Sequence, residues 1–113
     1  MALEESAIRS GMIKLDSSNF SLWKPMMEDI LYCKDLYEPI VNNKIPIGVT
    51  EEDWRVLNRK AVGMIRLYIN HNIFHHVAND TNAYEMWQML ESMYERKRTM
   101  NKASVIKRLA KLE

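Results

Sequence analysis

Residues 81–94 read TNAYEMWQMLESMY, a stretch typical of an amphipathic helix that packs on a hydrophobic core. Apolar side chains recur there at helical spacing, at Ala83, Met86, Trp87, Leu90, Met93 and Tyr94. Asn82 precedes Glu85 by three residues, the spacing of a capping box, so Asn82 or Thr81 is expected to cap the helix. Each large side chain contributes about 1.5–3 kcal/mol when buried. The stripe therefore requires apolar partners from elsewhere in the chain.

Two other segments that carry tryptophan are expected to supply these partners. Trp23 follows turn residues at 16–19, and proline favours the first turn of a helix, so a helix is predicted from near Pro25 to Lys34 or Tyr37. A longer helix is predicted over residues 50–69, capped by Thr50 and carrying Trp54. The predicted structural core consists of Trp23, Trp54, Trp87, Leu90 and Tyr94, with the three indoles meeting in one interior.

The remaining segments complete a predicted all-α fold, a compact bundle of about five helices in one domain over residues 12–113. Residues 1–11 are expected to form a flexible arm, residues 39–49 a connecting loop, and residues 70–72 a break before a helical turn at 73–77. A last helix begins near Met100. Gly63 lies inside the second helix at a cost of about 1 kcal/mol relative to Ala, which predicts close helix packing at that point.

The composition indicates one globular domain from a reducing compartment. The 113 residues are 47 % hydrophobic, with only three glycines and three prolines, which argues against an all-β fold. The single cysteine excludes an internal disulfide. No apolar run reaches the roughly 18 residues that span a bilayer, and the first residues do not resemble a signal peptide. A cytoplasmic or nuclear protein without a membrane partner is expected.

The charge is distributed unevenly. Residues 1–95 carry nine Lys or Arg and fourteen Asp or Glu, a net of −5, whereas residues 96–113 carry seven bases and one acid, a net of +6. Clustered bases attract RNA phosphates, but they can equally neutralise an acidic neighbour within the chain or in another subunit. The candidate contact residues for a nucleic acid or partner are Arg96, Lys97, Arg98, Lys102, Lys107, Arg108 and Lys111.

No catalytic, cofactor or metal site is predicted, so the chain is not expected to be an enzyme or to bind a small-molecule substrate. His71 and His75 are four residues apart, but no third ligand lies nearby, and the H-E-x-x-H arrangement and the glycine-rich phosphate loops are absent. Cys33 is interpreted as a small buried hydrophobic residue. The nine methionines are interpreted as core filler, although a groove for a partner helix is the alternative interpretation; its lining would be Met26, Met27, Met64, Met86, Met89 and Met93.

Four segments, taken in order, resemble the Gag protein of plant copia-type LTR retrotransposons. The first is KLDSSNFSLWK at 14–24 followed by MEDIL at 27–31, and the second is RKAVGMIR at 59–66. The third is the A-x-x-x-W-x-x-L-E-x-x-Y pattern over residues 83–94, and the fourth starts at Asn101-Lys102. The resemblance covers about residues 12–113.

This resemblance implies a structural role as the N-terminal lobe of a capsid, with a helical fold like that of the retroviral capsid N-terminal domain. Such lobes self-assemble into virus-like particles that package RNA, so the implied partners are other copies of the chain and RNA. The family's zinc knuckle is absent, since Cys33 is the only cysteine. Ile106 and Leu109 are the candidate assembly strip. Two alternatives stay open: a helical protein-interaction adaptor, and a small RNA-binding domain that uses the basic C-terminal helix.

Overall fold

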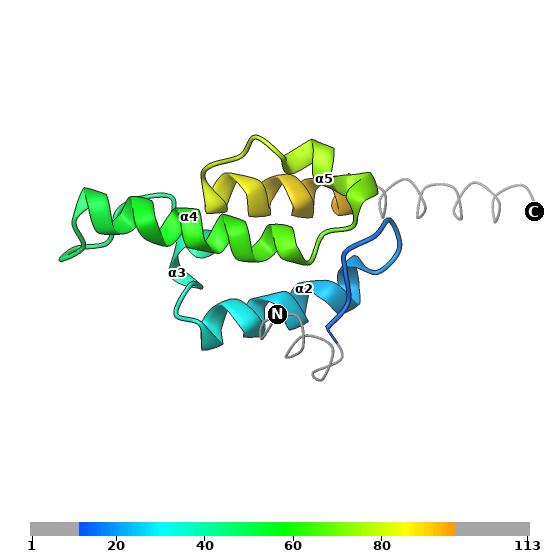
Figure 1. The fold of residues 1–113 in the computed structure, drawn as a ribbon, viewed down its shortest axis with the longest axis horizontal. Coiled ribbons are helices and arrows are strands. Elements are labelled where there is room, and N and C mark those ends of the chain that lie inside the picture. Colours follow the sequence, from blue (N-terminus) through cyan, green and yellow to red (C-terminus); the bar gives the residue numbers. More distant parts are fainter. Residues whose placement is uncertain (1–11, 97–113) are drawn as a thin grey trace, which may run out of the picture.

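A computed structural model describes residues 12–96, which contain five helices (Figure 1). They are α2 (Phe20–Cys33), α3 (Glu38–Val41), α4 (Glu51–Leu67), α5 (His71–Val77) and a helix over residues 83–96, here termed the Trp87 helix. Within this part of the chain the only β pairing is an isolated parallel bridge between Leu15 and Ile69. The all-α class is confirmed. The expected arm at 1–11 and the expected last helix from Met100 lie outside the described residues.

The prediction that the first helix begins near Pro25 is wrong, because α2 begins at Phe20. The backbone N–H groups of Leu22 and Trp23 already donate to the carbonyl of Asn19, at 3.1 and 2.8 Å. Pro25 lies inside the helix, where its missing N–H leaves the Ser21 carbonyl without its helical donor. Ser21 and Pro25 are both exposed, so that carbonyl faces water rather than the core.

The end of α2 near Lys34 agrees with the prediction and has the hydrogen bonds of a Schellman motif. The Leu36 N–H donates to the Leu31 carbonyl at 2.7 Å, and the Asp35 N–H donates to the Tyr32 carbonyl at 3.2 Å. Asp35 adopts a left-handed backbone conformation with φ of 59°. Leu31 and Leu36 are both buried, which supplies the hydrophobic contact that commonly accompanies this motif.

The predicted loop over residues 39–49 contains a short helix that was not predicted from the sequence. Pro39 lies in the first turn of α3, where proline needs no N–H and its fixed φ suits the helix. Pro39 and Ile40 are buried, and α3 packs against α4. The two prolines and the glycine therefore exclude helix only from the remainder of this segment.

The predicted cap of α4 is confirmed, whereas its predicted end is two residues too late. Thr50 Oγ1 accepts a hydrogen bond from the Asp53 N–H at 3.1 Å. The helix ends at Leu67, and Ile69 then pairs with Leu15. The expected break at 70–72 is also wrong in part, because Asn70 caps α5, which starts at His71; its side chain accepts from the Asn72 N–H at 3.2 Å.

The core is one continuous cluster built by all five helices, with Ile40 as the contribution of α3, together with Leu15. Trp23 and Trp87 stack at its centre with ring centroids 5.7 Å apart, and the Trp23 indole N–H donates to the Tyr68 carbonyl at 2.9 Å. Trp54 is also buried, with 8 % of its surface exposed, but it is not part of this cluster. The expected convergence of three indoles is therefore a convergence of two.

Residues 12–19 connect two separate parts of the fold. The Leu15 N–H donates to the Tyr68 carbonyl at 2.7 Å, and the Leu15 carbonyl accepts from the Asn70 N–H at 2.8 Å. The Tyr94 hydroxyl donates to the Asp16 carbonyl. This segment thus joins the α4–α5 junction to the far end of the Trp87 helix, and Leu15 is fully buried beneath it.

Two polar side chains of α4 connect it to other helices. The Asn58 side-chain oxygen accepts from the Ala83 N–H at 2.9 Å, which satisfies one donor of the first turn of the Trp87 helix. The Arg66 Nη2 donates to the carbonyls of Ala78 and Asp80 at 2.7 and 2.5 Å, just past the end of α5. Lys24 and Glu91 form an ion pair at 3.7 Å between α2 and the Trp87 helix.

No helix among the described residues 12–96 packs closely at Gly63, where close helix packing was predicted. A Cβ built at this glycine would meet only the Arg59 guanidinium, at 3.8 Å, which is ordinary contact. Gly63 faces away from the buried side of α4, which is formed by Trp54, Asn58, Ala61, Val62 and Ile65.

Candidate interaction surfaces

Most of the predicted basic surface lies outside the described residues. Arg96 is described and is exposed at the end of the Trp87 helix. The other predicted contact residues, and the expected assembly strip, lie beyond residue 96; these are Lys97, Arg98, Lys102, Lys107, Arg108, Lys111, Ile106 and Leu109. Their role stays a prediction.

The histidines and the cysteine form no recognisable reactive centre in the described part. Between residues 12 and 96, no three His, Cys, Asp or Glu side chains gather as they would around a metal ion. The rings of His75 and His76 lie 4.1 Å apart on exposed positions of α5. Cys33 is exposed, so the expectation of a buried residue is wrong. It follows Leu31 by two positions, which turns it away from the buried face of α2.

Tyr94 stacks on Phe20 with ring centroids 4.4 Å apart, and this pair extends the stack of Trp23 and Trp87 toward the surface. Burial raises the pKa of Tyr94 to about 12, and the negative charge of Asp16 adds to the increase. The phenol is therefore a neutral hydrogen-bond donor at physiological pH. Its arrangement is that of a structural contact.

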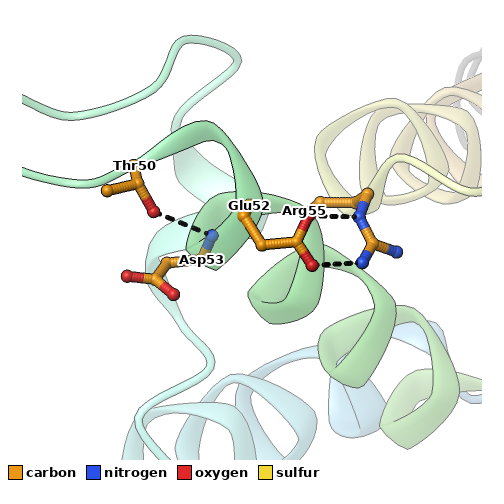
Figure 2. A network of polar contacts seen from close by, with 4 residues as sticks. All are labelled: Thr50, Glu52, Asp53 and Arg55. Carbon is orange, nitrogen blue, oxygen red and sulfur yellow. Dashed lines mark hydrogen bonds and ion pairs between the residues drawn. The ribbon is translucent and has the colours of Figure 1, made fainter.

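The start of α4 carries a compact polar network (Figure 2). Beside the Thr50 cap, the Arg55 guanidinium donates to the two Glu52 carboxylate oxygens at 3.2 and 2.5 Å. This hydrogen bond and the positive charge of Arg55 lower the pKa of Glu52, and Glu52 in turn raises the pKa of Arg55. Both side chains are exposed, so the pair orders the local surface and adds little stability.

The charges along the exposed side of α4 change sign from one end to the other. Its first turn carries Glu51, Glu52 and Asp53, where acids are favoured by the helix dipole. One and two turns later, Arg55, Arg59 and Lys60 are all exposed. The helix therefore presents an acidic end followed by a basic middle.

Several apolar side chains are exposed beside and along α4. Ile45 and Ile47 lie in the loop that leads into α4, and Ile47 is fully exposed. Gly48 in this loop has φ of +89°, a conformation that glycine adopts without strain. Val56 and Leu67 are exposed on α4 itself, at 36 and 52 %. Isolated exposed apolar residues are ordinary, but a set along one face indicates a contact surface.

The methionine groove of the adaptor alternative does not form as one surface. Met27 and Met86 are fully buried in the core, as expected for core filler. Met26, Met64 and Met93 are half-buried, and Met89 is exposed.

No helix among the described residues is both long enough and apolar enough to cross a membrane.

Local sequence patterns could not reveal the functions of Asn58 and Arg66. Their partners are 12 to 25 residues away in the sequence, just past the end of α5 for Arg66 and at the start of the Trp87 helix for Asn58. One signal pointed to Asn58, which falls on the apolar side of its helix, four residues after Trp54 and three before Ala61.

Comparisons with known proteins agree with the resemblance in sequence. The family model described as gag-polypeptide of LTR copia-type matches residues 27–113. The chain is 30 % identical over 106 residues to the retrovirus-related Pol polyprotein from transposon TNT 1-94 of Nicotiana tabacum. The match covers 92 % of this chain but only 8 % of that polyprotein. No solved structure matches the chain significantly.

Proposed function

The chain belongs to the gag polypeptides of copia-type LTR retrotransposons, and from this premise we propose that it is a structural capsid segment that self-associates into particles around RNA. The match of the family over residues 27–113 carries the proposal. A buried core that leaves the charged and apolar faces of α4 exposed is consistent with this function. The work of such a segment is contact between copies rather than catalysis.

Self-association is tested by sedimentation velocity on the purified chain over a range of concentrations, with electron microscopy at the highest. We expect species larger than the monomer that grow with concentration, and further growth when RNA is added. Individual contacts in a shell are weak and gain strength by multivalency, so the monomer should dominate at low concentration. A strictly monomeric chain at every concentration, with and without RNA, would refute the proposal.

RNA binding is tested separately, by fluorescence anisotropy with a single-stranded RNA at several salt concentrations. Replacing Arg96, Lys97 and Arg98 with glutamine should weaken binding and reduce the slope of log affinity against log salt by about 0.7 for each phosphate that is no longer neutralised. Replacing the exposed Lys14, Lys34 and Lys44 with glutamine removes the same charge elsewhere on the surface and is the matched control. An equal reduction in affinity in the two triple variants would mean that net charge alone binds RNA.

A further inference from the structure

The outward face of α4 carries a stripe of four residues at helical spacing. Val56, Lys60, Gly63 and Leu67 follow one another at intervals of four, three and four residues, which places them on one side of the helix. This side is opposite to the buried side of α4. Val56 and Leu67 are partly exposed apolar residues, and Lys60 is exposed.

Nothing among the described residues 12–96 explains the glycine at position 63. Glycine in a helix interior costs about 1 kcal/mol relative to alanine, and here only the Arg59 side chain lies within 4 Å of where a Cβ would be. The backbone also has an ordinary helical conformation at this position, so a positive φ does not require glycine. A glycine that leaves open space on a helix surface permits close approach of another backbone.

The apolar residues at the two ends of this face are complementary when two helices lie antiparallel. The loop before α4 extends past the N-terminal end of the helix (Figure 1) and carries Ile45 and Ile47. Leu67 lies at the opposite end, roughly 16 Å from Val56 at a rise of 1.5 Å per residue. Turning a second copy end to end brings its loop to the Leu67 end of the first.

The charges follow the same symmetry. Consider an antiparallel pair of α4 helices with Val56 at the two-fold axis. Asp53 and Glu52 of one copy then lie at the same level along the helix as Arg59 and Lys60 of the other copy. Each copy then offers Asp53 to Arg59 and Lys60 of the other, on both flanks of the contact, whereas Glu52 is already paired with Arg55 of its own copy. The helix dipoles also oppose one another favourably in this arrangement.

We propose that the outward face of α4 packs against the same face of a second copy of this chain, antiparallel, with the two Val56 side chains nearest the two-fold axis. This contact rests on the self-association proposed above and assigns a surface to it. A two-fold contact uses the same patch on both copies, so the patch must be self-complementary. The acidic start, basic middle and apolar ends of α4 meet that requirement. Binding of an unrelated partner would not require the face to be self-complementary.

Disulfide trapping tests the position of the axis. The exposed Cys33 is first replaced by serine, and Val56→Cys, Gly63→Cys and Leu22→Cys are then made singly in that background. Helices packed 8–10 Å apart bring facing residues within disulfide range, about 4.4–6.8 Å between Cα atoms. Val56→Cys should form cross-linked dimers under mild oxidation. The two Gly63→Cys residues would be roughly 20 Å apart along the helices and should not cross-link, nor should Leu22→Cys on α2.

A pair of charge variants tests the complementarity. Lys60→Asp alone and Asp53→Lys alone should each weaken self-association about tenfold, because like charges then face each other. An equimolar mixture of the two variants should recover wild-type association, since opposite charges meet again on both flanks. Circular dichroism checks that each variant remains helical. A mixture as weak as its components would refute the assigned surface.

The substitution Gly63→Gln distinguishes an effect on self-association from an effect on folding stability. Glutamine favours helix over glycine, so the thermal midpoint should rise, while self-association should weaken because the side chain fills the contact. Ser92→Gln, on an exposed position of the Trp87 helix, should leave self-association unchanged. Wild-type association without cross-linking at Val56→Cys would refute this surface alone. A wild-type chain that never associates would refute the proposed function together with it.

Discussion

Asp35 adopts a left-handed conformation, with φ of 59°, which costs most L-residues roughly 1–2 kcal/mol. It occupies the position after the α2 cap where glycine is the usual residue. Aspartate tolerates this conformation better than most side chains do, but glycine tolerates it without strain. The sequence shows no glycine there, so the tight end of α2 could be placed near Lys34 while its geometry could not be predicted.

Asp35→Gly should therefore stabilise the protein by about 0.5–1 kcal/mol, since it removes the strain and keeps both backbone hydrogen bonds. Urea unfolding followed by circular dichroism measures the change. Lys34→Gly is the matched control: Lys34 has φ of −96°, so glycine there removes no strain and should not stabilise. Equal effects of the two substitutions would contradict this explanation of the α2 end.

The ionisation of Tyr94 makes the free energy of unfolding depend on pH in the alkaline range. Its folded pKa of about 12 exceeds the ordinary value of 10.0, so the folded state holds this proton more tightly than the unfolded state. The contribution is complete below pH 10 and is lost as pH rises toward 12. Wild type should lose more stability over this range than Tyr94→Phe. The difference between the two unfolding curves isolates Tyr94 from other titrating groups, and parallel curves would contradict the assignment.

At the scale of elements, prediction from the sequence succeeded where the signal was local. Thr50 was predicted as the cap of α4, and Thr81 or Asn82 as the cap of the Trp87 helix. Thr50 and Asn82 each accept the expected hydrogen bond, from the N–H of Asp53 and of Glu85. Pro25 misled the prediction, because whether a helix tolerates proline depends on the exposure of the carbonyl left unpaired. The hydrogen bonds of Arg66 could not be predicted because its acceptors, Ala78 and Asp80, lie beyond the end of α5. Only tertiary structure brings them together.

Arg66→Lys should destabilise the protein by about 1.5–3 kcal/mol, the range for a charged hydrogen bond. The Arg66 Nη2 atom alone donates to the carbonyls of Ala78 and Asp80. A lysine side chain is one atom shorter, so its ammonium cannot reach both carbonyls in the same geometry. Arg59→Lys, on an exposed position of the same helix, should change stability by less than about 0.5 kcal/mol. Chemical denaturation compares them. Hydrogen exchange of amides in α5 should become faster in Arg66→Lys only. Unchanged exchange would mean that the Arg66 hydrogen bonds do not stabilise the end of α5.

For the molecule as a whole, the helical class and the family could be predicted from the sequence, because both depend on ordered local patterns. The site could be predicted only as a basic surface, which lies mainly outside the described residues. The α4 face was not predicted as a contact surface, since close helix packing was expected at Gly63 with no partner helix identified. A one-dimensional pattern identifies an apolar or small residue but does not say whether its neighbour belongs to the same copy.

One continuous core predicts one cooperative unfolding transition. Trp23 and Trp87 lie in the same cluster as residues from every helix of that core, so indole fluorescence and helical circular dichroism should change together. The comparison is best made with Trp54→Phe, which removes the indole outside the cluster. Helicity that survived after the fluorescence change was complete would mean that the elements unfold separately.

The cluster draws on residues from Leu15 to Leu90, and this span has a consequence for synthesis. While Trp87 is still inside the ribosomal exit tunnel, the emerged Trp23 has no indole to stack on. The Asn58 side-chain oxygen likewise lacks the Ala83 N–H from which it accepts a hydrogen bond in the folded chain. The chain must therefore wait, with its apolar side chains uncovered, until nearly all of this span has been translated. On a messenger RNA that carries several ribosomes, such incompletely folded chains lie next to identical ones.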